Sequence, residues 1–200
     1  MSGIVTQNVL GTSGLIKSPD VGGGAWNFIS KQTASADSTI DFTSGIDSTY
    51  KEYLFTFNNI HPSEDGGQFS FNFTTDGTNY NATKTSTAIE CYHKEDDSNY
   101  TFLYRALGLA QSTGNQVFMV GIGNDNDQSG VGYLQLYNPS STTFVKHFIA
   151  DCNFAEVQDM TFTEPTAGYI NTTSAVTGAR FLMHSGNIDS GDICLYGLTT

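Results

Sequence analysis

The most chemically suggestive stretch of the sequence is GIGNDNDQSG, Gly121 to Gly130. Its centre supplies hard oxygen ligands of the kind that calcium prefers, from Asn124, Asp125, Asn126 and Asp127. The EF-hand spacing is missing, and no Glu stands at the closing position. Asn and Asp are also ordinary turn residues. The stretch therefore predicts a solvated turn first, and a loop that binds an ion or a glycan as the alternative.

Other combinations of reactive side chains carry less weight. Cys91 and His93 lie two apart and would share one face of a strand, but no second Cys/His pair follows at a metal-site spacing. Carboxylate pairs for glycoside cleavage can be drawn from any acidic sequence, here from Asp65, Glu90, Asp151 and Glu156. The sequence has no Gly-x-Ser-x-Gly, no His-Glu-x-x-His and no phosphate loop. We expect no enzymatic activity and no cofactor.

Aromatic side chains beside Asn and Asp offer a different chemistry, the binding of sugars by stacking and hydrogen bonding. The residues with this setting are Tyr80, Tyr92, Tyr100 and Tyr137. The alternative is that each tyrosine belongs to the core or its rim. The sequence leaves both interpretations open.

The elements that must position these residues are short strands. QFSFNFTT alternates most cleanly, and it predicts that Phe69, Phe71 and Phe73 face inward while Gln68, Ser70, Asn72 and Thr74 face outward. EYLFTFNNI places Tyr53, Phe55 and Phe57 on one face in the same way. Similar runs continue to DICLYGL at the C-terminus, separated by Gly, Asn, Asp, Ser or Pro. This spacing predicts an all-β fold, an antiparallel β-sandwich of the jelly-roll type over residues 25–200.

Residues 1–24 have a different pattern. Their aliphatic residues stand among small polar ones with neither a helix nor a strand period: Ile4, Val5, Val9, Leu10, Leu15 and Ile16. Gly22 to Gly24 would act as a hinge. We expect an extended N-terminal arm that docks on a partner or on another copy of the chain, with a solvated tail as the alternative.

Charge and cysteine content narrow the function classes. The net charge is −12, which argues against binding to nucleic acid or to anionic lipid. The three cysteines, Cys91, Cys152 and Cys194, have no framework spacing and are expected in the core, unpaired. Neither a signal peptide nor a membrane span is predicted, which favours folding in a reducing cytoplasm.

Several segments resemble virion proteins of tailed bacteriophages of marine bacteria. They include SADSTIDFTSGIDSTYKEYLFTFNNIHPSEDGGQFSFNFTTDGTNYN, GYLQLYNPSSTTFVKHFI and INTTSAVTGARFLMHSGNIDSGDICLYGL. The resemblance implies a non-enzymatic subunit of a tail fibre, another appendage or the capsid surface, assembled with other virion proteins in the host cytoplasm. For a fibre we expect a homo-oligomer, with three-fold symmetry as the first choice. The alternative is a carbohydrate-binding module at a fibre tip that recognises a host surface glycan.

Overall fold

The computed structural model describes residues 26–199, and these residues form strands and connecting loops without a helix. The thirteen strands are β1 (Trp26–Asp37), β2 (Ile40–Phe42), β3 (Glu52–Pro62), β4 (Gly67–Thr74), β5 (Lys84–Lys94), β6 (Tyr100–Arg105), β7 (Gln116–Ile122), β8 (Gly130–Tyr137), β9 (Lys146–Glu156), β10 (Met160–Thr163), β11 (Thr166–Ile170), β12 (Gly178–Met183) and β13 (Ile188–Leu198). The predicted arm, residues 1–24 with its six aliphatic residues, lies outside the described residues.

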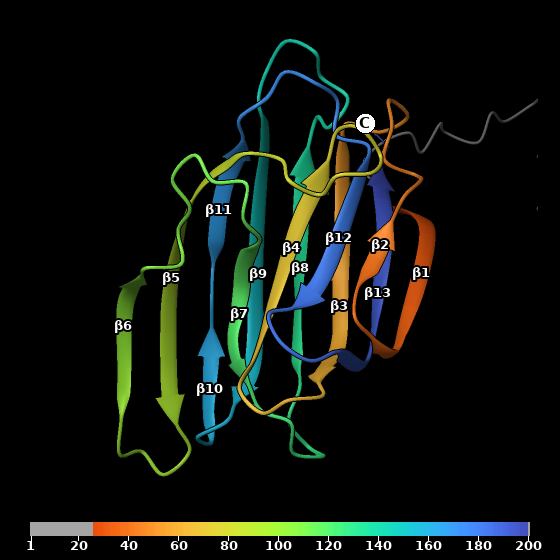
Figure 1. Ribbon diagram of the computed structural model, residues 1–200. Coiled ribbons are helices and arrows are strands. Elements are labelled where there is room, and N and C mark those ends of the chain that lie inside the picture. Colours follow the sequence, from red (N-terminus) through yellow and green to blue (C-terminus); the bar gives the residue numbers. More distant parts are fainter. Residues whose placement is uncertain (1–25, 200) are drawn as a thin grey trace, which may run out of the picture.

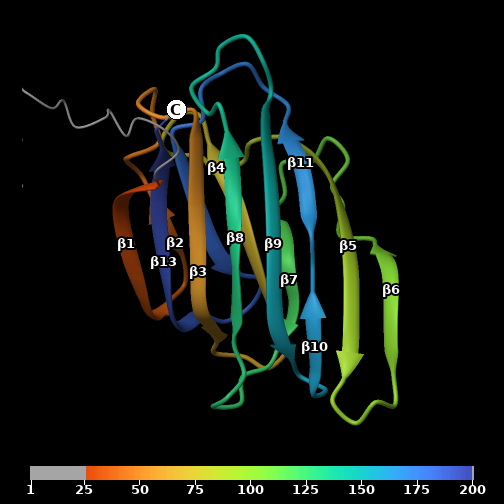
Figure 2. The same ribbon diagram turned by 180° about the vertical axis from the view of Figure 1, so that it is seen from behind.

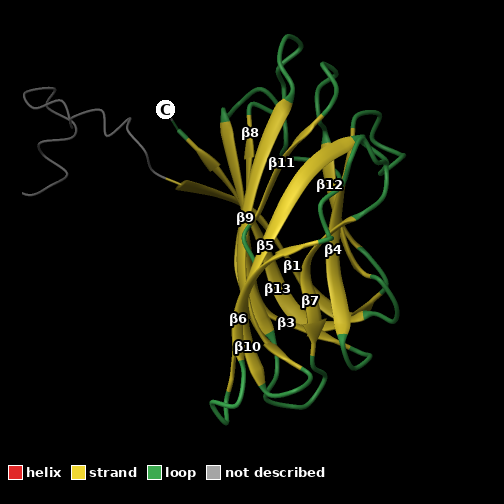
Figure 3. Ribbon diagram, turned by 90° about the vertical axis from the view of Figure 1, so that its left-hand side faces the viewer, coloured by secondary structure: helices red, strands yellow, loops and turns green. Residues whose placement is uncertain are grey.

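The strands form two layers, which Figure 3 shows edge-on. The large sheet has the order β1-β13-β3-β8-β9, followed by β10 and β11 in one line, then β5 and β6. The small sheet has the order β7-β4-β12-β2, and Figure 1 shows it in front of the large sheet. A single residue pair, Ile122 with Glu156, joins β7 to β9. Every pairing is antiparallel, so the predicted antiparallel β-sandwich is confirmed.

Phenylalanine side chains fill the space between the sheets. Phe69, Phe71 and Phe73 are fully buried, as the alternation predicted. Phe57 from the large sheet meets Phe69, Phe118 and Phe181 edge to face, with ring centroids 5.2–5.5 Å apart. The predicted inward face of β3 is also confirmed, because Tyr53 and Phe55 are fully buried.

The predicted outward face of β4 is wrong for three of its four residues. Ser70, Asn72 and Thr74 are as buried as the phenylalanines between them. The segment before β7 covers Asn72, whose amide donates hydrogen bonds to the Thr113 carbonyl and to Asn115. The turn after β4 folds back over Thr74, whose hydroxyl accepts hydrogen bonds from the following backbone. Alternation identified a strand correctly but could not show that both of its faces are covered.

The C-terminal strand is central to the architecture. β13 pairs with β1 on one side and β3 on the other over almost its whole length. Ile193 and Leu195 are fully buried, and Cys194 beside them is 9% exposed. Cys152 is buried too, but Cys91 is only half-buried, so the expectation that all three cysteines belong to the core is wrong for Cys91. Cys91 lies on β5 near the edge of the large sheet, where less of the fold covers it.

Candidate functional site

The Asn/Asp loop connects β7 to β8 and is braced against the β3–β4 turn. The backbone N–H of Asn124 donates a hydrogen bond to the Asp65 carboxylate at 3.2 Å, and His61 Nε2 lies 3.2 Å from the Asp125 carbonyl. Within the loop, the backbone N–H of Gln128 donates to the Asp125 carbonyl. Over residues 26–199, no three His, Cys, Asp or Glu side chains are grouped to hold a metal ion. Binding of an ion or a glycan by Asn124, Asp125, Asn126 and Asp127 stays a prediction.

The other reactive side chains are spread through the fold. Asp65 lies in a turn, Asp151 on the exposed side of β9, and Glu156 at the end of β9, while Glu90 is buried inside. Cys91 and His93 do share the exposed side of β5, but His93 Nε2 lies 2.9 Å from the Asp97 carboxylate and its ring meets Tyr100 edge to face. The structure therefore brings Cys91 and His93 together, and places the four carboxylates at separate sites.

A different feature dominates the surface: the face of the large sheet that points away from the small sheet, hereafter the outer face (Figure 2). Residues paired across antiparallel strands share a face, so the register identifies its members. One row runs Phe28–Tyr196–Leu54–Gln135–Ile149–Ala167–Thr87. Another runs Val131–Asn153–Thr163–Cys91–Phe102.

Large apolar side chains gather on this face. The exposed ones within residues 26–199 are Trp26, Phe28, Tyr100, Phe102, Tyr104, Val131, Tyr133, Phe144 and Ile149. All except Phe144, which lies in the β8–β9 loop, belong to the outer face by register. Concentration on one face distinguishes this set from the single exposed apolar residues that any protein surface carries.

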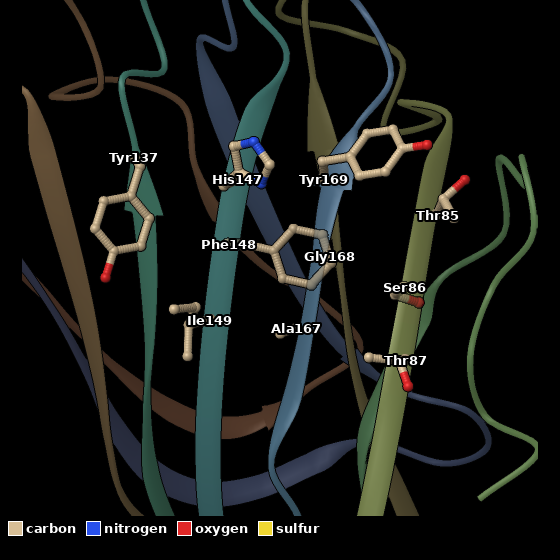
Figure 4. A pocket seen from close by; sticks show the side chains of 10 residues that line it. All are labelled: Thr85, Ser86, Thr87, Tyr137, His147, Phe148, Ile149, Ala167, Gly168 and Tyr169. Carbon is tan, nitrogen blue, oxygen red and sulfur yellow. The ribbon is translucent and has the colours of Figure 1, made fainter.

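One cleft of the outer face lies over β8, β9, β11 and β5 and has a volume of about 770 Å³ (Figure 4). Tyr137, His147 and Tyr169 stand beside one another on three successive strands, with His147 in the middle and its ring centroid 6.1 Å from that of Tyr169. Ile149, Ala167 and Thr87, neighbours in one row, form its floor. Burial raises the pKa of the Tyr137 hydroxyl, with a further contribution from the charge of Glu52, so this hydroxyl stays a hydrogen-bond donor at neutral pH.

Two further clefts extend the outer face toward its ends. One, of about 510 Å³, lies over β3 and β8 and is lined by Trp26, Leu54 and Tyr133 among others. The other, of about 720 Å³, lies at β5 and β6 and is lined by Tyr92, His93, Asp97, Tyr100, Thr101 and Phe102. Flat apolar walls with hydroxyl, amide and imidazole groups at the rim suit stacking and side-chain insertion, which are modes of binding.

The four tyrosines considered for sugar binding occupy three different settings. Tyr137 and Tyr100 belong to the outer face and line different clefts. Tyr92 stacks on Phe162 at 5.0 Å, facing the interior, and also contributes to the cleft at β6. Tyr80 lies under the Arg180 guanidinium, 4.1 Å from the ring centroid, away from the outer face. Of the four, Tyr100 is exposed and the other three are half-buried, and only Tyr100 and Tyr137 belong to the outer face. Sugar binding by these tyrosines stays a prediction.

Sequence reasoning missed most of the outer face. Ile149, Tyr133 and Phe102 stand in alternating strands, where they read as core residues. The one available signal is that GYLQLYN and YTFLYR carry large apolar residues at both strand parities, which indicates two apolar faces rather than one.

Comparison with protein-family models, with curated proteins and with solved structures gave no match for this chain. Residues 26–199 contain no helix long and apolar enough to cross a membrane.

Proposed function

We propose that this protein is a non-enzymatic structural subunit of a phage virion, of the appendage, fibre or capsid-surface type. The observation that carries the proposal is the outer face, where eight of the nine large exposed apolar side chains gather on one side of the sandwich. A concentration of exposed apolar side chains on one face marks an interaction site. We assign it to contact with neighbouring virion subunits.

Two further features support an assembly role. The interior contains a large cluster of contacting aromatic rings, and such a close-packed core gives a stiff body suited to a particle that survives outside a cell. Trp26, where the described chain begins, lies in β1 at the edge of the large sheet, beside the outer face. The proposed docking arm, residues 1–24, precedes this strand in the sequence.

The proposal is tested by reconstituting particles with altered subunits. Ile149→Lys places a charge at the centre of the outer face, where Ile149 is 43% exposed. We expect this variant to fold but to be lost from purified particles, as judged by quantitative mass spectrometry. Phe144→Lys is the matched control, because Phe144 is exposed but lies off the outer face. Equal incorporation of both variants would overturn the assignment.

A second candidate function is recognition of a host glycan, and the cleft between Tyr137 and Tyr169 favours it. The cleft combines two tyrosine rings with the hydroxyl of Thr87 and the imidazole of His147, the mixture that sugars use for stacking and orientation. Tyr137→Ala and Tyr169→Ala should each abolish retention on a glycan array, whereas Phe144→Ala should not. A wild-type chain that binds no glycan on an array of marine bacterial polysaccharides would exclude this function.

A further inference from the structure

Strand β6 forms an open edge of the large sheet. It pairs with β5 alone, and it lies at the end of the sheet farthest from β1 (Figures 1 and 2). An open edge presents unpaired backbone groups to any other strand, and proteins usually protect it with a bulge, a proline or a charge. β1, at the opposite edge, carries such a bulge between Phe28 and Ser30. β6 pairs regularly with β5 over its whole length; it contains no proline, and its one charged residue is Arg105 at its end, so Tyr100–Tyr104 is uncharged.

The free backbone groups of β6 belong to its aromatic residues. The Lys94 amide donates a hydrogen bond to the Asn99 carbonyl at 2.8 Å, which identifies this opposed pair as a hydrogen-bonded one. Hydrogen-bonded pairs alternate along an antiparallel ladder, so Thr101 and Leu103 direct their backbone groups at β5. Tyr100, Phe102 and Tyr104 therefore direct their N–H and C=O groups at the open edge. Their side chains are 73%, 70% and 66% exposed.

The sequence of this edge is complementary to itself. Tyr100-Thr101-Phe102-Leu103-Tyr104 has the same large aromatic residues when read in either direction from Phe102. In an antiparallel pair of two such strands centred on Phe102, each Phe102 faces its copy, and Tyr100 faces Tyr104. These are also the residues whose backbone groups point outward, so all three pairs would be hydrogen-bonded pairs with aromatic side chains opposed.

We propose that β6 pairs with β6 of a second copy of this chain, antiparallel and centred on Phe102, to form a two-fold dimer. The two large sheets become one continuous sheet. Their outer faces become one surface of twice the length, with the six aromatic rings of the two β6 strands at its middle. A contact of this kind is isologous and closed, so it does not propagate into a fibre of strands.

The distribution of charge supports the antiparallel arrangement. The β5–β6 turn carries Glu95, Asp96 and Asp97 at one end of β6. Antiparallel pairing puts the two acidic turns at opposite ends of the shared strands, on the order of 20 Å apart, which is beyond the screening length of about 8 Å in physiological salt. Parallel pairing would put the turns side by side. A chain with a net charge of −12 can therefore associate along β6 without bringing its acidic turns together.

The first test is the mass of the isolated chain by sedimentation equilibrium, over a range of concentrations. We expect a dimer for the wild-type chain. Phe102→Lys places two like charges opposite each other at the two-fold axis. Phe102→Pro removes the backbone N–H that points at the partner strand and leaves the hydrogen bonds to β5 intact. Each substitution should raise the dimer dissociation constant at least about tenfold. Phe144→Lys is the matched control, because Phe144 is 70% exposed, as Phe102 is, but lies in the β8–β9 loop off the outer face, and it should leave the dissociation constant unchanged. A wild-type monomer or trimer, or a dimer that survives both Phe102 variants, overturns the proposal.

A second measurement tests the register and does not depend on the charge variants. In the proposed dimer the Cα atoms of Tyr100 and the partner's Tyr104 are about 5.5 Å apart, within reach of a disulfide. Tyr100→Cys with Tyr104→Cys, in a Cys91→Ser background, should yield a covalent dimer on mild oxidation. Tyr104→Cys alone in that background should not, because each new thiol would face a tyrosine. Equal yields of covalent dimer from the double and the single cysteine variants, or no covalent dimer from either, would contradict the proposed pairing of Tyr100 with the second copy's Tyr104. Both tests use the isolated chain, so their outcome is independent of the virion assignment.

Discussion

Truncating Phe71 to Ala tests whether the aromatic cluster between the sheets is the main source of stability. Phe71 is fully buried, and its ring meets Phe73, Phe118 and Phe148 edge to face at centroid distances of 5.1–5.3 Å. Both sheets contribute to this cluster, because Phe71 belongs to β4 and Phe148 to β9. The substitution removes the whole ring and leaves a cavity that the close-packed neighbours cannot fill.

The expected loss of unfolding free energy is about 3–5 kcal/mol, the range for a fully buried Phe. For a chain of this size that corresponds to a melting temperature lower by roughly 6–20 °C. The matched control is Phe28→Ala. Phe28 is 60% exposed and has one ring contact, with Tyr196 at 5.7 Å, so its loss should cost at most about 1 kcal/mol.

The assay is urea unfolding followed by circular dichroism, with both variants measured beside the wild-type chain. A Phe71→Ala variant as stable as Phe28→Ala would contradict the predicted loss of unfolding free energy. It would mean that the stripe of Phe69, Phe71 and Phe73 does not hold the sheets together.

Three other predictions follow from the sequence and the structure. Lys84 is fully buried, and burial lowers the pKa of its amine to about 8; because the unfolded chain keeps this proton to about pH 10.4, the contribution of Lys84 to stability should rise by about 1–2 kcal/mol between pH 7.5 and 9.5. Burial raises the pKa of the Cys152 thiol and acts in the opposite direction, so the rise is measured in urea titrations as the difference between the wild-type chain and Lys84→Met, which share that thiol. Deleting residues 2–21 should leave a soluble sandwich with a cooperative melt that no longer joins the particle, and wild-type occupancy of the particle would show that the arm does not dock. Incubation of host polysaccharide with the protein should leave the length of the polysaccharide unchanged in size-exclusion chromatography. Shortened polysaccharide would overturn the non-enzymatic assignment and direct attention to Asp125, Asp127 and Asp151.

The sequence predicted the parts of the fold that follow from alternation. Phe69, Phe71 and Phe73, and likewise Tyr53, Phe55 and Phe57, repeat every second residue, and one face of a strand must then be apolar. Such a pattern places a residue on a face. It does not say how many faces the rest of the chain covers, which is why Asn72 was expected in solvent and is buried under the segment before β7.

The burial of two lysines, Lys84 and Lys146, could not be predicted from the sequence either. Lys84 reads as an exposed residue at the start of a strand, yet its amine reaches across to β4 and donates hydrogen bonds to Asn72 Oδ1 at 2.6 Å and the Ala82 carbonyl at 2.7 Å. Lys146 is buried in a similar way and donates to the Thr172 carbonyl. Asn72 and Thr172 come from other segments of the chain, so no local pattern could indicate these two contacts.

The outer face shows the converse problem. Ile149 and Phe102 have the residue types of a core, and sequence patterns cannot tell an apolar side chain covered by a second sheet from one left exposed. The pairing register shows which face each residue occupies, because it places Ile149 and Phe102 in rows on the side of the large sheet that the small sheet does not cover. The candidate site was therefore found from pairing between strands rather than from any motif.

We propose that the outer face is the contact surface of this protein in its assembled state. Hydroxyl-radical footprinting with mass spectrometry measures it directly, by comparing the isolated chain with purified particles. Tyr133, Ile149 and Phe102 should lose most of their reactivity on assembly, while Phe144, exposed in the β8–β9 loop, should keep its reactivity. Protection of Phe144 with unchanged reactivity of the three outer-face residues would show that the outer face is not the contact surface.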